Sequence, residues 1–315
     1  MGLHGRCPRC MKILLATGLI IFIKIAFDKT ITLLTTNESD GEIFIDLEKH
    51  YRGFEQINYN PIATIHGSTA INVAIGLGIT SLKSKWKTSV EINETFPFFH
   101  TFLPSFCDTA TTSSQFHYTF FLAFDNNDTF FTDPSRRKAF QSIYRYNIDE
   151  HCLAWVDHRI HFVKCSHSKH PAWAQNDAMM VAYRSGMDYF YRINDDTLLQ
   201  TKHWTEIYIS ILTHFDPPNV GVVGPNHTGG NVDILTYDFV HRTHIDIHGF
   251  YYPRVFKGWH ADRWITDVYK PNRSVKALDV GLVHTKENER RYHKNKMDLN
   301  DVAKVVERSR GFVKK

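Results

Sequence analysis

The chain has 315 residues, of which 43% are hydrophobic and 14% aromatic, and this composition excludes an intrinsically disordered protein. The length allows one large domain or two small ones. The formal net charge at pH 7 is only +4 and no long basic block is present, so nucleic acid is not an expected partner.

The N-terminal segment has the pattern of a targeting signal. Arg6, Arg9 and Lys12 precede an apolar run over 13–23, which resumes at 25–27. No clear A-x-A cleavage site follows, so residues 1–27 are predicted to form a cytosolic tail and an uncleaved signal anchor. The alternatives are a cleaved signal peptide, which would give a secreted protein, and a buried N-terminal helix or strand.

The basic flank predicts a cytosolic N-terminus and a lumenal body, as in a single-pass type II protein of the Golgi or endoplasmic reticulum membrane. N-glycosylation sequons agree with a lumenal body, and they begin at Asn37, Asn93, Asn127, Asn226 and Asn272.

The cysteines fall into two groups. Cys7 and Cys10 form one CPRC motif beside the predicted anchor, which is a weak indication of zinc because no second pair follows. Cys107, Cys152 and Cys165 would be lumenal. They allow one disulfide, for example Cys152–Cys165, and leave one free thiol.

The predicted body begins after a stem. Residues 28–94 are interpreted as a stem and leading segment, in which 61–90 contain a helix-like run of Ala, Ile and Val. A strand pattern follows over 96–106, and a second strand is predicted within 117–128. The third candidate strand covers 159–164.

Strands and helices then alternate. A helix is predicted from Pro171, with Gly186 just past its end, and the strand 189–193 follows. A helix over 204–214 and a strand over 220–223 come next. This order predicts an α/β fold with a mostly parallel central sheet flanked by helices. Residues 293–315 are interpreted as a basic C-terminal tail.

Acids and amides follow two of these strands. Asp125 ends the second strand, and Asn194, Asp195 and Asp196 follow the strand 189–193. Ligands bind at the carboxyl ends of strands in open α/β sheets, and a divalent cation turns the repulsion between adjacent carboxylates into attraction. The alternative is ordinary: Asn and Asp are common in turns and at helix N-caps.

The segment 221–249 combines a loop rich in Gly and Asn, over 224–231, with a predicted helical turn rich in acids and histidines. In that turn His241 and Arg242 could contact an anionic substrate. The alternative is a solvated helix face.

Two later residues are further candidates. Asp262 lies between Trp259 and Trp264 in the sequence, and an acid among aromatic rings can act as a general base. Its alternatives are an N-cap or a salt bridge with Arg263 or Arg273. His284 ends a short predicted strand, and a neutral imidazole is a good metal ligand.

The ordered set of these features resembles the GT-A fold of nucleotide-sugar glycosyltransferases over residues 95–292. The stretches DYFYRINDD, GVVGP, LTYDFVHRTHIDIHG and WHADRWITDVY are similar to a group of these enzymes. That group includes the glycosyltransferase-like C-terminal domain of the estrogen-regulated growth-regulation protein.

The resemblance implies roles for particular residues. Asp196 matches the last acid of a DxD motif and His284 a second ligand of Mn²⁺ or Mg²⁺. Asp125 matches the position near the nucleoside of the donor. Asn194 stands where the family usually has Asp, with Asp195 as a second polar group. Asp262 matches the catalytic base of inverting members; in a retaining enzyme it would only orient the acceptor.

The implied function is metal-dependent transfer of a hexosyl or N-acetylhexosaminyl group. The expected donor is a UDP-sugar, and the expected acceptor is a hydroxyl group of a glycan or protein in the secretory pathway. Two alternatives remain. One is a metal-dependent hydrolase or nucleotidyltransferase that uses Asp195, Asp196, His241 and His244. The other is a catalytically degenerate module that binds a sugar nucleotide or glycan.

Overall fold

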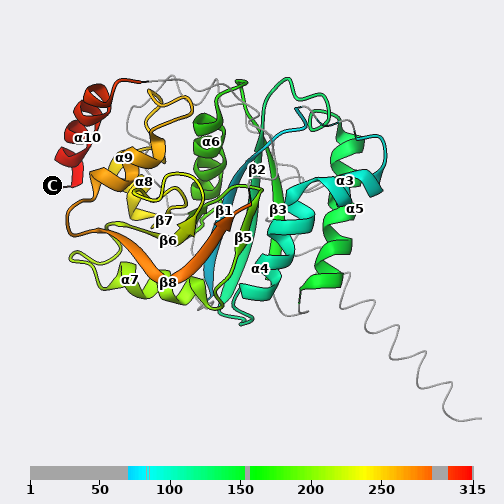
Figure 1. Ribbon diagram of the computed structural model, residues 1–315, viewed down its shortest axis with the longest axis horizontal. Coiled ribbons are helices and arrows are strands. Elements are labelled where there is room, and N and C mark those ends of the chain that lie inside the picture. Colours follow the sequence, from blue (N-terminus) through cyan, green and yellow to red (C-terminus); the bar gives the residue numbers. More distant parts are fainter. Residues whose placement is uncertain (1–69, 83, 85, 153–156, 286–296, 314–315) are drawn as a thin grey trace, which may run out of the picture. The chain divides into compact units, whose positions relative to one another are not determined.

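The computed structural model describes residues 70–313, except 83, 85, 153–156 and 286–296. These residues build one eight-stranded sheet with the order β3-β2-β1-β4-β7-β6-β8-β5 (Figure 1). In chain order the strands are β1 (Ile71–Ile79), β2 (Phe116–Phe124), β3 (Asp157–Lys164), β4 (Tyr189–Arg192), β5 (Thr197–Leu199), β6 (Val222–Thr228), β7 (Phe239–His241) and β8 (Ser274–His284).

The sheet is mixed, so the prediction of a mostly parallel sheet is correct for only half of it. Strands β3, β2, β1 and β4 are parallel neighbours. Beyond β4, the pairs β4–β7, β6–β7 and β5–β8 are antiparallel, while β6–β8 is parallel. Each antiparallel pair contains one of the short strands β5 and β7. Such short insertions can pair antiparallel because an antiparallel neighbour needs no crossover helix.

Two apolar cores cover the two faces of the sheet. The first core holds α3 (Ser89–Thr95), the π-helical turn η1 (Phe98–Phe102), α4 (Leu103–Thr109), α5 (Pro134–His151) and α7 (Trp204–Thr213). The second holds α6 (Pro171–Arg184), α8 (Thr243–His248), α9 (Ala261–Val268) and α10 (Leu299–Val313). The described residues therefore form a three-layer α/β/α arrangement.

The segment expected to be helix-like contains a central strand. Residues 71–79 form β1, which pairs with β2 and β4, so the sheet begins ahead of Thr95. Val73, Ile75 and Leu77 enter one core while Ala74 enters the other. This period of two is that of a strand buried on both faces.

The strand expected over 96–106 is also wrong, because these residues form η1 and the first part of α4. Phe98, Phe102 and Phe106 are fully buried at a spacing of four residues, which places them on one side of a helix. Pro97 and Pro104 occupy early helical positions, where a missing N–H is tolerated. The aromatic content had favoured a strand.

The elements around the predicted site agree with the sequence. The strands expected over 117–128, 159–164 and 189–193 correspond to β2, β3 and β4, and the two predicted helices correspond to α6 and α7. Gly186 has a φ of +80°, the left-handed conformation expected just past the end of α6.

The disulfide joins Cys107, at the end of α4, to Cys152, which caps α5. Cys165 is a buried free thiol, so the pairing Cys152–Cys165 is wrong. The bridge closes a loop across a sequence separation of 45 residues and ties two helices of one core together.

The described C-terminal residues form a helix within the expected tail. Trp264 Nε1 donates to Ser309 Oγ at 3.0 Å, and Arg310 Nη2 donates to the Asp267 carbonyl at 2.8 Å, so α10 is joined to α9. Within the described ranges, no helix is both long enough and apolar enough to cross a membrane. The predicted anchor, residues 1–27, lies outside those ranges.

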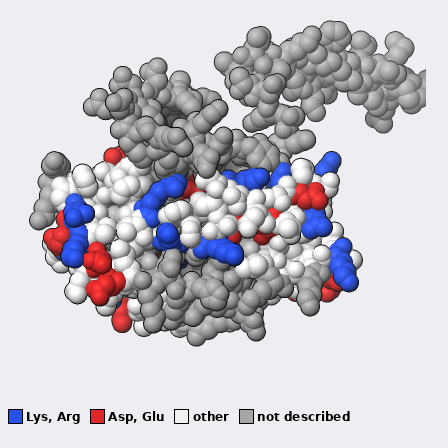
Figure 2. Space-filling view, turned by 90° about the horizontal axis from the view of Figure 1, so that it is seen from above, with Lys and Arg blue, Asp and Glu red and all other residues white. Residues whose placement is uncertain are grey.

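Figure 2 shows the molecule from above the view of Figure 1. Lys and Arg side chains lie along the middle of this face, with Asp and Glu side chains among and beside them. Charges of both signs are thus interspersed, in keeping with the small net charge of the chain.

Candidate functional site

The order of the first strands locates the site. From β1 the chain moves outward to β2 and β3, and then returns through α6 to β4 on the other side of β1. Ligands of open α/β sheets bind at the carboxyl ends of the strands where the order reverses in this way. Asn194, Asp195 and Asp196 follow β4 directly at that point.

Strand pairing brings Asp196 and His284 together. Thr197, the first residue of β5, lies opposite His284, the last residue of β8. His284 Nε2 is 3.1 Å from Asp196 Oδ2, although 88 residues separate the two in sequence. Thr285 fixes the backbone nearby, because its N–H and its hydroxyl donate to the Asp196 carbonyl at 3.0 and 2.9 Å.

This pair has the donor atoms and spacing of two ligands of one divalent cation. Adjacent ligands of an octahedral ion with bonds of about 2.1 Å lie about 3 Å apart, close to the separation of Asp196 and His284. Imidazole nitrogen and carboxylate oxygen both suit Mn²⁺. A metal ion at Nε2 would leave the ring proton on Nδ1, which has no hydrogen-bond partner among the described residues. The residues present therefore fit a metal ion.

A buried acid that the sequence analysis missed lies at the same end of β4. The Arg192 N–H donates to the Asp238 carbonyl at 2.9 Å, which holds Asp238 beside the end of this strand. Asp238 is fully buried, and its two carboxylate oxygens accept hydrogen bonds from Tyr251 and Tyr252.

Burial raises the pKa of Asp238 to about 6, although the Arg192 charge and the two tyrosine hydroxyls lower it; Asp262 adds a raising effect. Burial alone would lower the pKa of Arg192, but Tyr252, Asp238 and Asp262 outweigh burial and raise it. Arg192 thus stays charged among these acids.

The Tyr237 hydroxyl is influenced by acids from two parts of the site, Asp196 after β4 and Asp262 on α9. Burial raises its pKa most, Arg192 lowers it, and the charges of Asp196 and Asp262 raise it. The Tyr237 ring lies edge-on to His284, with centroids 6.3 Å apart. Asp196 and Asp262 therefore act on the same hydroxyl.

Unpaired polar atoms gather around Tyr237. Buried polar groups nearly always have a partner, so a group of unpaired ones indicates where a ligand binds. Among the described residues, the buried atoms without a hydrogen-bond partner include four here: Arg192 Nε, His227 Nδ1, Tyr237 Oη and His284 Nδ1.

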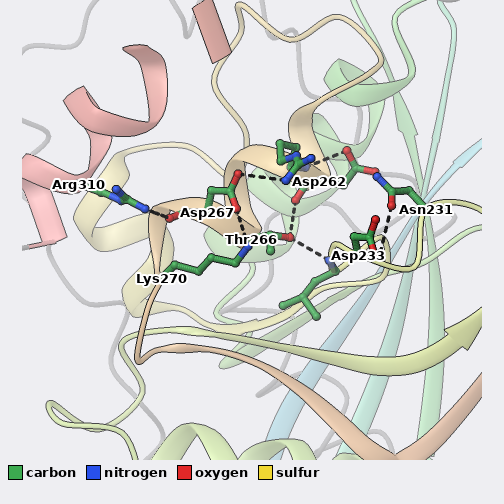
Figure 3. Close-up of polar contacts among 9 residues, drawn as sticks. Asn231, Asp233, Asp262, Thr266, Asp267, Lys270 and Arg310 are labelled. Atoms are coloured by element: carbon green, nitrogen blue, oxygen red, sulfur yellow. Dashed lines mark hydrogen bonds and ion pairs between the residues drawn. The ribbon is translucent and has the colours of Figure 1, made fainter. Parts of the chain in front are cut away.

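Asp262 is the second residue of α9, and its Oδ1 accepts from the Arg263 N–H at 2.9 Å. Thr266 Oγ1 donates to the Asp262 carbonyl at 2.7 Å and accepts from the Leu235 N–H at 2.9 Å (Figure 3). This connection joins the start of α9 to the chain just before Asp238. Asp262 is not the N-cap, which is His260, and among the described residues it forms no salt bridge with Arg263, which lies 3.7 Å from Asp267, or with Arg273.

Asp125 lies at the same edge of the sheet. It follows β2, is buried, and its Oδ2 accepts from the Lys169 N–H at 2.9 Å. Strand β1 separates β2 from β4, so two strand spacings, about 10 Å, lie between the ends of these strands.

Asn194 and Asp195 lie in the turn between β4 and β5. The Asn194 carbonyl accepts from Thr197 Oγ1 at 2.8 Å, and Asp195 is only 1% exposed. The turn holds both residues next to Asp196.

His241 is not brought to this group. It pairs with Tyr189, the first residue of β4, about 10 Å along the strand from its carboxyl end. The expected helical turn is strand β7 followed by α8, and this register directs His241 to the opposite edge. His244 is buried between the Tyr269 hydroxyl and the Tyr251 carbonyl. The hydrolase alternative therefore loses its proposed constellation.

One sequence signal could have indicated the missed residues. Arg192 ends a buried aromatic strand two residues before Asn194, and a charged residue there requires a buried acid nearby. Asp238, 46 positions further along, is that acid, but no spacing rule connects the two.

No protein-family model and no curated protein matches the chain. Among solved structures, it is similar to S. aureus TarS, with 9% identity and a TM-score of 0.45 over 75% of this chain. It is also similar to a protein of Desulfovibrio desulfuricans G20 described as a nucleotide-diphospho-sugar transferase, with 10% identity, a TM-score of 0.36 and 76% of each chain covered.

A third similar structure is mouse xyloside xylosyltransferase 1, with 7% identity and a TM-score of 0.30 over 49% of this chain and 53% of that one. The match to TarS covers only 39% of the TarS chain. Because all three TM-scores lie below 0.5, none of these likenesses establishes what this chain does.

Proposed function

We propose that the chain is a metal-dependent glycosyltransferase that moves a sugar from a nucleotide-diphosphate donor to an acceptor hydroxyl. The observation that carries this proposal is the meeting of Asp196 and His284 at the carboxyl end of β4, where the strand order reverses. The unpaired polar atoms around Tyr237 support a ligand at the same place.

Asp196 and His284 would hold Mn²⁺ or Mg²⁺, which, when bound, neutralises charge on a departing diphosphate. Asp262 would accept the proton of the acceptor hydroxyl as this oxygen attacks the anomeric carbon. The buried acid Asp238 would keep Arg192 charged and fix the hydroxyls of Tyr251 and Tyr252. Hydrogen bonds would hold Asp238 and Asp262 in position before the substrate arrives, and such preorganisation favours catalysis.

The spacing of the acids suits a donor laid along the edge of the sheet. Asp125 would contact the nucleoside, while Asn194 and Asp195 would contact the ribose and phosphates beside Asp196. The separation of about 10 Å between the ends of β2 and β4 is comparable to the distance from a nucleoside to its diphosphate.

The finer assignments rest on the sequence. They are a UDP-sugar donor, a glycan or protein acceptor, a signal anchor in the Golgi or endoplasmic reticulum membrane, and membership of the narrower group named above. The Cys107–Cys152 disulfide supports a lumenal location, because disulfides persist in oxidising compartments.

The test is nucleotide release by the full chain over a panel of sugar nucleotides, with Mn²⁺, with Mg²⁺ and with a chelator. We expect metal-dependent release from one donor and transfer of its sugar to an acceptor. Asp301→Asn, on the exposed surface of α10, is the matched control and should behave like the unmodified chain. Phosphate release without sugar transfer would favour a hydrolase, and donor binding without turnover would favour a binding module.

A further inference from the structure

A second group of metal-ligand side chains lies at the end of β3. Cys165 follows this strand, His167 lies in the next turn, and Asp177 lies on α6. One potential ligand atom from each residue lies within 4.8 Å of those of the other two. None of these residues belongs to the Asp196–His284 pair.

The backbone holds the group in place. The Cys165 N–H donates to the Phe124 carbonyl at 2.9 Å, and the Asn126 N–H donates to the His167 carbonyl at 3.1 Å. His167 Nε2 is 3.0 Å from Asp177 Oδ2. The three side chains are therefore aligned by β2, by the turn after β3 and by α6.

One carboxylate oxygen of this group has no hydrogen-bond partner among the residues that the structure describes. Asp177 is completely buried, and no described residue donates a hydrogen bond to its Oδ1; Arg254 Nη2 lies 3.7 Å from this oxygen. Asp125 is a second acid close enough to act on the Cys165 thiol. A buried carboxylate oxygen without a hydrogen bond is costly in the interior, and a bound cation would satisfy it.

We propose that Cys165, His167 and Asp177 bind Zn²⁺. Thiolate sulfur, imidazole nitrogen and carboxylate oxygen are the three ligand types that zinc takes in proteins. With the thiol proton released to solvent, the two charges on zinc balance the Cys165 thiolate and the Asp177 carboxylate. Arg254 then serves as the outer partner of the ligating carboxylate.

The sulfur ligand separates this site from the one proposed for Mn²⁺ or Mg²⁺, which prefer oxygen. Among the cysteines that the structure describes, Cys165 is the one with a free thiol. The side chain of His167 is 10% exposed, so the ion can enter from its side. Three protein ligands leave a fourth position on a tetrahedral ion.

The zinc would also fix the predicted nucleoside end of the donor site. Lys169, two residues after His167, holds Asp125 through its backbone N–H at 2.9 Å. An ion that anchors His167 therefore limits the motion of the turn that orients Asp125.

The test uses the full chain with Cys7→Ser and Cys10→Ser, so that the CPRC motif contributes no thiolate. Titration with Co²⁺ should give thiolate-to-cobalt absorption that saturates at one equivalent and is displaced by Zn²⁺. Cys165→Ser should abolish this absorption, while His167→Gln and Asp177→Asn should weaken Zn²⁺ binding by about 100-fold or more. His284→Ala should change neither the cobalt absorption nor the Zn²⁺ affinity, which distinguishes this site from the proposed catalytic one.

Absence of the absorption in the parent chain, or its persistence in Cys165→Ser, would overturn the proposal. If Cys165→Ser does not fold, His167→Gln keeps the test decisive, because it retains the thiol and replaces a partly exposed side chain with another polar one. In that variant, Zn²⁺ should no longer raise the midpoint of thermal unfolding. An equal rise in the variant and the parent would also overturn the proposal.

Discussion

The loops that follow β2 and β4 look alike in sequence, because each brings two acids and at least one Asn directly after a buried strand. Their acids differ in what surrounds them. After β2, Asp128 accepts hydrogen bonds from the Thr80 hydroxyl, from the N–H and hydroxyl of Ser81, and from the N–H groups of Phe130 and Phe131. After β4, the Asp196 carboxylate has His284 as its neighbour.

This difference separates a structural acid from a candidate ligand. Protein donors satisfy the Asp128 carboxylate, and it connects the loop after β1 to the loop after β2. Asp196 has an imidazole nitrogen 3.1 Å from its carboxylate oxygen, a pair that one cation can bind. Strand-end acids are thus distinguished by their surroundings and not by their position in the sequence.

The largest expected effect is that of Asp196→Asn on turnover. Losing a charged metal ligand should lower metal-dependent nucleotide release by about 1,000-fold or more, which corresponds to about 4 kcal/mol. The free energy of unfolding should change by about 1 kcal/mol or less, because one hydrogen-bond partner is lost. Steady-state kinetics and urea unfolding measure the two effects. Unchanged turnover would remove Asp196 from the metal site.

Asp262→Asn should lower sugar transfer by about 100- to 1,000-fold, because an amide cannot accept the acceptor proton. Donor affinity should stay within about threefold of the parent value, since Asp262 is assigned to the acceptor side. Transfer kinetics and donor binding by calorimetry give the two numbers. Equal losses in both would assign Asp262 a structural role.

The sequence predicted the parallel half of the sheet better than the mixed half. Strands β2, β3 and β4 and helix α6 are separated by clear turn and cap residues, so local patterns suffice. Strand β1 was read as a helix because Ala, Ile and Val suit both elements and the two glycines obscured the period. Helix α4 was read as a strand because its helical spacing was masked by aromatic content.

The site was predicted only in part, for a related reason. Asp196 and His284 could be singled out because each follows a recognisable strand, and β5–β8 pairing brings them together. His241 was misplaced because the register of β7 against β4 cannot be read from residues 238–248 alone. Asp238 was not singled out because its partners, Tyr251 and Tyr252, meet it only through tertiary packing.

Substitution of Asp128 should have the opposite pattern to that of Asp196: a loss of stability with little loss of turnover. Asp128→Ala should lower the free energy of unfolding by about 3 kcal/mol, because buried N–H and hydroxyl donors of two loops lose their acceptor. Urea unfolding measures this loss. At temperatures where the variant is folded, metal-dependent release per folded molecule should stay near the parent value. A loss as large as that of Asp196→Asn would mean that Asp128 also serves the reaction.

The smallest expected effect concerns His248, a buried side chain that is neither a proposed metal ligand nor hydrogen-bonded within the described residues. Neither ring nitrogen of His248 has a hydrogen-bond partner within the described part of the chain, and burial lowers the pKa of His248 to about 4. His244, whose ring centroid is 5.0 Å away, has its pKa lowered to about 3 by burial and by His248.

A histidine whose folded pKa lies below its unfolded value supports stability at neutral pH and loses this contribution as pH falls from about 6.5 toward 4. His248→Phe keeps the ring among Phe250, Trp264 and Tyr269 and removes the titration. At pH 4.5 the variant should be more stable than the parent by about 2 kcal/mol beyond any difference at pH 8. Urea unfolding at the two pH values measures this; parallel pH profiles would show that His248 finds a partner in solution.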